Sequence, residues 1–101
     1  MKVFISGPYT SGDVVINVRN AVLMAEKVIE KGHIPFVPHL NHLWHLISPH
    51  EDIEFWYSFD LKWLRVCDIL LRLPGKSIAA DKEVRYALTH SKRVIHDINE
   101  L

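Results

Sequence analysis

The residues best suited to chemistry lie between positions 77 and 83, in the sequence Ser-Ile-Ala-Ala-Asp-Lys-Glu. An apolar run and a Pro-Gly turn precede this segment, so Ser77 stands where a helix is expected to begin. A hydroxyl together with the free N–H groups of a helix N-terminus suits an anion such as phosphate. Glu83 follows inside the expected helix, where a carboxylate can act as a nucleophile or as a general acid or base. The simpler alternatives are an ordinary N-cap for Ser77 and a surface ion pair for Glu83.

A second candidate segment is Ser6-Gly7-Pro8-Tyr9, which directly follows a short apolar run. Gly7 lets a ligand approach the backbone closely, and Pro8 stiffens the loop. Tyr9 offers a ring on which a base or a sugar can stack. The alternative for this segment is an ordinary turn at the end of a strand.

Asp60 is a second candidate carboxylate. It lies within an expected helix and shares a face with the aromatic residues Trp56 and Trp63. A carboxylate in apolar surroundings is costly unless it is paired or functional. The alternative is a satisfied pair with Lys62, Arg65 or a backbone donor.

Three of the seven histidines, His39, His42 and His45, recur every third residue. Such a spacing can place imidazoles on one side of a helical turn and bind a metal ion. No cysteine lies close to them, so we prefer a loop beside the ligand crevice, in which one or two histidines contact a nucleobase. No metal site is predicted.

The composition narrows the class of protein. The chain has 101 residues, of which 49% are hydrophobic, and 12 acidic residues balance 12 basic ones. A neutral chain argues against a nucleic-acid binder, which normally carries a basic face. The single Cys67 indicates a reducing compartment, and neither a signal peptide nor an apolar run of transmembrane length is recognisable. A cytoplasmic protein without membrane or nucleic-acid partners is therefore expected.

Short apolar runs alternate with amphipathic helical patterns along the chain. This order predicts a single α/β domain over residues 1–101, with a flavodoxin-like or Rossmann-like three-layer sandwich. A parallel sheet of about four strands in the order 2-1-3-4 would bring the loops over 6–13 and 74–77 together at the switch point, where ligands bind. Strands are expected over 2–5, 33–37, 68–73 and 93–96, helices over 17–31, 51–66 and 78–90, and a loop that can include a helical turn over 39–50.

Together these residues resemble the nucleoside 2-deoxyribosyltransferase-like superfamily, which includes the 2′-deoxynucleoside 5′-phosphate N-hydrolases. The resemblance runs from Phe4 to about Ile95. Its marks are the apolar strand before Gly7-Pro8-Tyr9, the helical segment over 60–68, and a Ser six residues before a Glu at position 83. The last two marks, in this order and spacing, are the more specific ones.

The resemblance implies a role for each matching residue. Glu83 matches the nucleophile that attacks the anomeric carbon, and Asp60 matches a carboxylate that assists substrate positioning and departure of the base. Ser77 matches the position that binds the 5′-phosphate in the nucleotide hydrolases and is typically Asp in the transferases that act on nucleosides. Ala79 stands where the family usually has Gly. The implied substrate-binding residues are Phe4, Gly7, Pro8, Tyr9, His39, Ser77 and Ala79.

The function predicted from the sequence is an N-glycosidase that hydrolyses the base–sugar bond of a (deoxy)nucleoside 5′-monophosphate, without a cofactor. The alternatives are a nucleoside deoxyribosyltransferase, a nucleotide-binding module without catalysis and a histidine-based metal protein. A homodimer or higher homo-oligomer is also expected, because relatives are dimeric and because the aromatics exceed what one small helix face buries. These aromatics are Trp44, Phe55, Trp56, Phe59 and Trp63.

Overall fold

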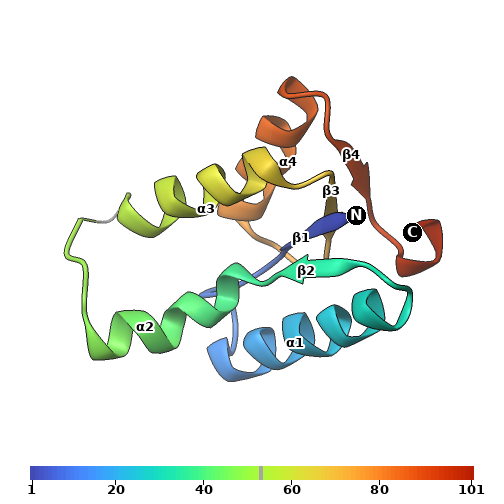
Figure 1. The fold of residues 1–101 in the computed structure, drawn as a ribbon. Coiled ribbons are helices and arrows are strands. Elements are labelled where there is room, and N and C mark those ends of the chain that lie inside the picture. The colour runs from blue at the N-terminus through green and yellow to red at the C-terminus, as the bar shows by residue number, and fades with distance from the viewer. Residues whose placement is uncertain (53) are drawn as a thin grey trace.

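The computed structural model describes residues 1–52 and 54–101. Within these residues the chain forms a four-stranded parallel sheet in the order β2-β1-β3-β4, with helices on both faces (Figure 1). The predicted fold class and strand order are therefore confirmed. None of the described helices has the length and apolar character needed to cross a lipid bilayer. The elements are β1 (Lys2–Ser6), α1 (Val14–Glu30), β2 (Ile34–Phe36), the 3-10 turn η1 (Pro38–Leu40), α2 (Asn41–Ile47), α3 (Phe55–Val66), β3 (Ile69–Arg72), α4 (Ile78–Thr89), β4 (Arg93–Ile95) and the 3-10 turn η2 (Ile98–Glu100).

The two central strands, β1 and β3, are covered on both faces. Alternate side chains of each strand enter opposite halves of the core, as the pleat of a strand requires. One half lies between the sheet and α1, and includes Val3, Ile5 and Leu71. The other half lies between the sheet and the pair α3 and α4, and includes Phe4 and Leu70. Apolar burial on both faces accounts for the nearly continuous hydrophobic runs of these strands, and leaves polar groups to their ends.

Helix α1 begins three residues earlier than the helical periodicity predicts. Asp13 caps its N-terminus, because the side chain accepts hydrogen bonds from the backbone N–H groups of Val15 and Ile16 at 2.9 and 3.2 Å. The cap satisfies donors that a helix start otherwise leaves free, so the first turn is helical although it contributes little to the core.

The inward faces of α1 and α4 are narrow. Ile29 and Leu88 lie at helical spacing from inward residues of their helices, but both are exposed. Both helices approach the core through small residues, Ala21 on α1 and Ala87 on α4, which are fully buried. A helix that contacts its neighbours through alanines lies close to them, and only a narrow stripe of side chains then escapes solvent.

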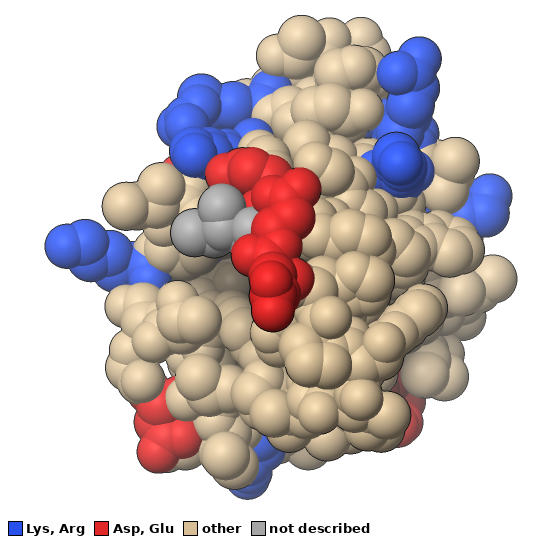
Figure 2. Space-filling view, turned by 90° about the vertical axis from the view of Figure 1, so that its left-hand side faces the viewer, with Lys and Arg blue, Asp and Glu red and all other residues tan. Residues whose placement is uncertain are grey.

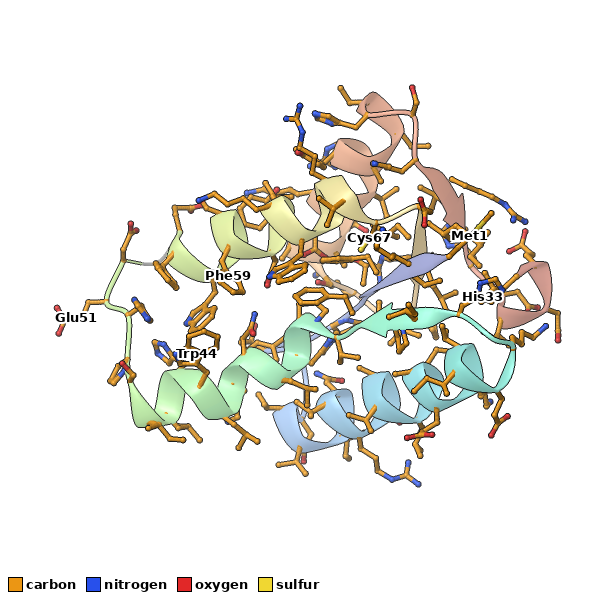
Figure 3. All side chains as sticks on the ribbon, in the orientation of Figure 1. Met1, His33, Trp44, Glu51, Phe59 and Cys67 are labelled. Atoms are coloured by element: carbon orange, nitrogen blue, oxygen red, sulfur yellow. The ribbon has the colours of Figure 1, made fainter. Side chains whose placement is uncertain are left out.

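The segment over 39–50 differs most from its expected structure, because η1 and α2 form where a loop with at most a helical turn was expected. No side chain caps α2, and its stability comes from packing against α3. Trp44 lies with its ring centroid 5.3 Å from that of Trp56 and 5.8 Å from that of Phe59. Trp44 and Phe59 point toward each other across the space between α2 and α3 (Figure 3). Helix α3 itself begins at Phe55 rather than at residue 51.

Only part of the aromatic group remains available for a partner. Phe55, Trp56 and Phe59 are half-buried among one another and their neighbours. Trp44 and Trp63 are 52% and 46% exposed. The homodimer expected from these residues stays a prediction.

We expect Gly75→Ala to lower the free energy of unfolding by about 1–3 kcal/mol, because it combines two costs. Gly75 has a φ of +114°, and an added Cβ would lie 2.7 Å from Cγ of Pro8. Gly12→Ala is the matched control, since Gly12 has a φ of +85° but open space around the Cβ position. Chemical denaturation of both variants checks the prediction, and an equal loss in both would show that contact with Pro8 contributes nothing.

Candidate functional site

A cleft of about 1020 Å³ opens at the carboxyl ends of β1 and β3. The loop after β1, η1, α2, α3 and the N-terminal half of α4 form its walls. This is the edge of the sheet where the strand order predicts a ligand site. Most of the predicted site residues line it: Gly7, Tyr9, His39, Asp60, Ser77, Ala79 and Glu83.

Two predicted substrate-binding residues, Phe4 and Pro8, are not among the residues that line the cleft. Phe4 is fully buried in the core, with its ring centroid 5.5 Å from that of Phe36. The Pro8 ring lies against Gly75, and its carbonyl oxygen accepts a hydrogen bond from His39. Both residues therefore lie behind the residues that line the cleft, because their side chains point away from it.

Glu83 projects from α4 with only 7% of its surface exposed. Ser6, the last residue of β1, donates a hydrogen bond of 2.7 Å from Oγ to Oε1 of Glu83. Burial raises the Glu83 pKa to about 7, while the Ser6 hydrogen bond and the positive charge of Arg72 act in the opposite direction. The surface ion pair considered for Glu83 is absent from the described part of the chain. Glu83 is thus a buried carboxyl group held from the sheet side.

Asp60 projects from α3 into the same cleft. Asn41, the first residue of α2, donates a hydrogen bond of 2.7 Å from Nδ2 to Oδ1 of Asp60. Burial raises the Asp60 pKa to about 8, the negative charge of Glu83 adds to the rise, and the Asn41 hydrogen bond opposes it. At neutral pH the cleft therefore holds a carboxylic acid at Asp60 and a carboxyl group at Glu83 that readily ionises. Such a pair can serve as acid and nucleophile in one reaction.

Ser77 is the N-cap of α4, and its Oγ accepts a hydrogen bond of 3.1 Å from the backbone N–H of Ala80. The N-cap considered for Ser77 is therefore confirmed. The N-terminus of α4, which faces the cleft, carries the partial positive charge of the helix dipole. Lys76 and Lys82 also line this end of the cleft, and Ala79 is exposed at its rim. The arrangement favours an anion near Ser77.

The rim of the cleft where α2 leads to α3 is acidic. Figure 2 shows a group of acidic side chains on the end of the molecule where α2 leads to α3. The exposed acids of that segment that line the cleft are Glu51, Asp52 and Glu54. Because like charges repel, a phosphate group would be disfavoured at this rim. The charges along the cleft thus differ, with Lys76 and Lys82 near the start of α4 and these three acids near the start of α3.

His39 is buried in η1 and donates a hydrogen bond of 3.0 Å from Nε2 to the carbonyl oxygen of Pro8. Burial lowers the His39 pKa, and the Pro8 hydrogen bond opposes this effect only in part. The imidazole is therefore neutral at physiological pH. Its Nδ1 is a buried acceptor that has no partner within the described residues. An acceptor of this kind fixes the orientation of any donor that enters the cleft beside it.

His42 and His45 are held by different neighbours. Tyr9 Oη lies within hydrogen-bonding distance of His42 Nδ1, and His45 Nδ1 accepts a hydrogen bond of 3.0 Å from Trp56 Nε1. The three-residue spacing of the histidines thus does not bring their rings to one point. Across residues 1–52 and 54–101, no three His, Cys, Asp or Glu side chains converge as a metal site would require.

Three residues contribute to the site in ways that the sequence did not predict: Asn41 and Tyr57 line the cleft, and Ser6, which begins the second candidate segment, holds Glu83 by a hydrogen bond. Tyr57 lines the cleft, and burial together with the negative charge of Glu83 raises its pKa. Tyr57 could have been found, because it precedes Asp60 by three residues on one helix and so shares its face. Ser6 and Asn41 carry no such signal, because their roles depend on contacts with α4 and α3.

The chain matches one family model, and its fold is similar to that of solved structures. A family model described as a domain of unknown function, DUF7768, matches residues 1–97. No curated protein matches the sequence. A 2-deoxyribosyltransferase from the bacterium Bacillus psychrosaccharolyticus superposes with a TM-score of 0.67 at 22% identity, over 93% of this chain and 69% of that one. A 2-desoxiribosyltransferase from Leishmania mexicana gives a TM-score of 0.66 at 15% identity, over 92% of this chain and 61% of that one.

At these identities the likeness shows the fold alone, and that fold is deoxyribosyltransferase-like. The chain spans 61% of the length of the second structure, less than two thirds of it. The activity must therefore be argued from the cleft itself.

We expect the stability of Glu83→Gln relative to the wild type to depend on pH. The folded-state pKa of Glu83 is about 7 against an ordinary value of 4.5, so the folded protein holds an extra proton between these values and loses stability as the pH rises through them. The variant should match the wild type near pH 5 and exceed its free energy of unfolding by on the order of 1–3 kcal/mol near pH 8. Denaturant titrations at both pH values measure the difference.

The control is Glu26→Gln, a change at an exposed position of α1. This variant makes the same change of side chain outside the cleft. A difference between Glu83→Gln and the wild type that stays constant with pH would show that Glu83 titrates alike in the folded and unfolded chains.

Proposed function

This chain belongs to the DUF7768 family, and we propose that it is an N-glycosidase that hydrolyses the base–sugar bond of a (deoxy)nucleoside 5′-monophosphate. The observation that carries the proposal is the buried Glu83, which faces the same cleft as Asp60 while Ser77 and two lysines line one end. Two carboxyl groups in different environments supply an acid and a nucleophile, and the positive end supplies a place for phosphate. The shared deoxyribosyltransferase-like fold supports the same chemistry.

In the first step the ionised Glu83 attacks the anomeric carbon of the sugar, and the bond between that carbon and the base nitrogen breaks. The electron pair of this bond leaves with the base, which takes a proton from Asp60. A pKa of about 8 keeps Asp60 protonated at neutral pH, and the Asn41 hydrogen bond to Oδ1 leaves Oδ2 to carry the proton. The product is a glycosyl ester of Glu83 with an oxocarbenium-like transition state before it.

In the second step water attacks the anomeric carbon and displaces the Glu83 carboxylate. Asp60, now ionised, accepts a proton from this water, which restores both residues to their starting states. Ser6 stays hydrogen-bonded to Oε1 of Glu83 and so keeps Oε2 aimed at the cleft. The overall reaction releases a free base and a sugar phosphate, and needs no cofactor.

The positive end of the cleft indicates which class of substrate would bind. The start of α4 presents backbone N–H groups beside the Ser77 hydroxyl, and Lys76 and Lys82 add positive charge. A 5′-monophosphate placed there would extend its sugar toward Glu83, about 1.7 turns along the same helix. The base would then reach the walls made by α2 and α3, where Tyr9 and Trp56 offer rings for stacking.

A deoxyribosyl transfer between bases is the second candidate, and the fold that the chain shares with two deoxyribosyltransferases favours it. The first step is the same, but a free base replaces water in the second step. Adding a second base to the reaction distinguishes the two, because only a transferase forms a new nucleotide. Binding of a nucleotide without release of its base would instead indicate a binding module.

We expect the protein to release free base from at least one member of a panel of ribo- and deoxyribonucleoside 5′-monophosphates. Glu83→Gln should lower the rate by about 1000-fold or more, because the amide cannot form the glycosyl ester. Chromatography of the released base measures the rate, and Glu26→Gln is the matched control with unchanged activity. Release that survives Glu83→Gln would refute the proposed mechanism.

We expect Ser77→Asp to weaken binding of nucleotides more than that of nucleosides, because a carboxylate at the helix start repels a phosphate dianion. Aspartate is also a good N-cap, so the start of α4 should be preserved. Calorimetric titration should show a loss of about tenfold or more in affinity for a monophosphate and little change for the matching nucleoside. Equal losses for both ligands would place the phosphate elsewhere.

A further inference from the structure

Arg72 is a nearly buried cation that the proposed reaction does not yet use. It is the last residue of β3, and only 10% of its side chain is exposed. Side chains alternate along the strand: Leu71 packs on the α1 side and Leu70 on the side of α3 and α4. Arg72 therefore leaves the sheet on the same side as Leu70, toward α4.

The guanidinium group restrains the conformation of the loop between β3 and α4. It donates hydrogen bonds to the carbonyl oxygens of Leu73 and Gly75, and Nη2 lies 3.0 Å from Oδ1 of Asp81 in the first turns of α4. Gly75 also lies against the Pro8 ring. The loop that ends at Ser77 is thus held between the first loop of the chain and a planar group with fixed donor directions.

Arg72 is also close to the hydrogen bond that holds Glu83. Ser6 on β1 is the strand partner of Arg72 on β3, and Ser6 Oγ donates to Glu83. The positive charge of Arg72 counteracts part of the effect that burial has on the Glu83 pKa. A guanidinium group stays charged throughout the pH range of proteins, so this contribution does not vary with pH.

We propose that Arg72 is a positioning residue: it fixes the loop that carries Ser77 and places a permanent positive charge on the sheet side of Glu83. The charge favours the ionised form of Glu83, which is the form that attacks the sugar if the proposed function is correct. Arg72 itself makes no contact with the cleft, so its effect passes through the loop and the carboxyl group.

Other charged and titratable groups also surround Glu83, and the test must separate them from Arg72. Asp60 and Tyr57 belong to α3, and the negative charge of Glu83 raises the pKa of both. His39 of η1, Lys76 of the loop and Lys82 of α4 itself also line the cleft, together with Tyr9, three further histidines (His42, His45 and His50) and three acids (Glu51, Asp52 and Glu54). None of these side chains is replaced in the variants below.

The experiment is a direct titration of the Glu83 side-chain carboxyl carbon by NMR, from about pH 4 to about pH 10. Glu83→Gln identifies the resonance. Arg72→Met should raise the Glu83 pKa by about 1, because the opposite charge is lost. Arg72→Lys keeps the charge and should leave the pKa near the wild-type value.

Asp81→Asn is the matched control, because it breaks the same ion pair while Arg72 keeps its charge and its carbonyl partners. Removing a negative charge cannot raise the Glu83 pKa electrostatically. A rise in Arg72→Met with none in Asp81→Asn supports the proposal. An unchanged pKa in Arg72→Met, or an equal rise in both variants, overturns it.

If Arg72→Met does not fold, the proposal is tested with Arg72→Lys instead. A lysine cannot make the same fork of hydrogen bonds, so amide hydrogen exchange over 75–80 should accelerate while the Glu83 pKa stays in place. Unchanged exchange overturns the positioning role. The titration requires no turnover, so a wild type that releases no base would refute the proposed function and still leave the effect of Arg72 on Glu83 measurable.

Discussion

The hydrogen bond between Ser6 and Glu83 joins the central strand β1 to helix α4. The part of the cleft at the carboxyl ends of the strands is arranged around this bond. A carboxyl group with 7% exposure is costly to ionise, and the cost is reduced where a donor and a positive charge face it. Both come from the sheet, with Ser6 on β1 and Arg72 on its neighbour β3. The ends of the two most buried strands thus determine how easily the group facing the cleft ionises.

Asp60 approaches the same cleft from the opposite wall and under different constraints. Its hydrogen-bond donor, Asn41, belongs to α2, and the nearby charge that raises its pKa is that of Glu83. Because each carboxylate disfavours ionisation of the other, the two groups titrate as a pair rather than independently. The pKa values of about 7 and about 8 are consistent with a state that has one proton between the two groups over part of the neutral range. A cleft in this state holds a proton donor and a carboxylate at the same time.

The sheet and its order were predictable because their signal is local and strong. The runs at β1 and β3 are apolar at nearly every position, which only strands covered on both faces require. Helix α2 was not predictable on the same basis, since its sequence has no capping residue at its start and its aromatic contacts lie on α3. Glu83 and Ser77 could be proposed from their spacing on one helix, whereas Ser6 and Asn41 act through partners 77 and 19 residues away.

Helix α4 carries both ends of the proposed chemistry, and this has a geometric consequence. The Cα atoms of Ser77 and Glu83 are separated by six helical steps, or about 9 Å along the axis, a distance that a rigid helix holds constant. Under the proposed function, the helix therefore sets the span from phosphate to anomeric carbon. The walls that would face the base belong instead to α2 and α3, which contribute His42, His45 and Trp56. Substitutions of these three residues would change the surroundings of the base while the spacing between Ser77 and Glu83 remains as α4 defines it, but α3 also carries Asp60, the proposed proton donor.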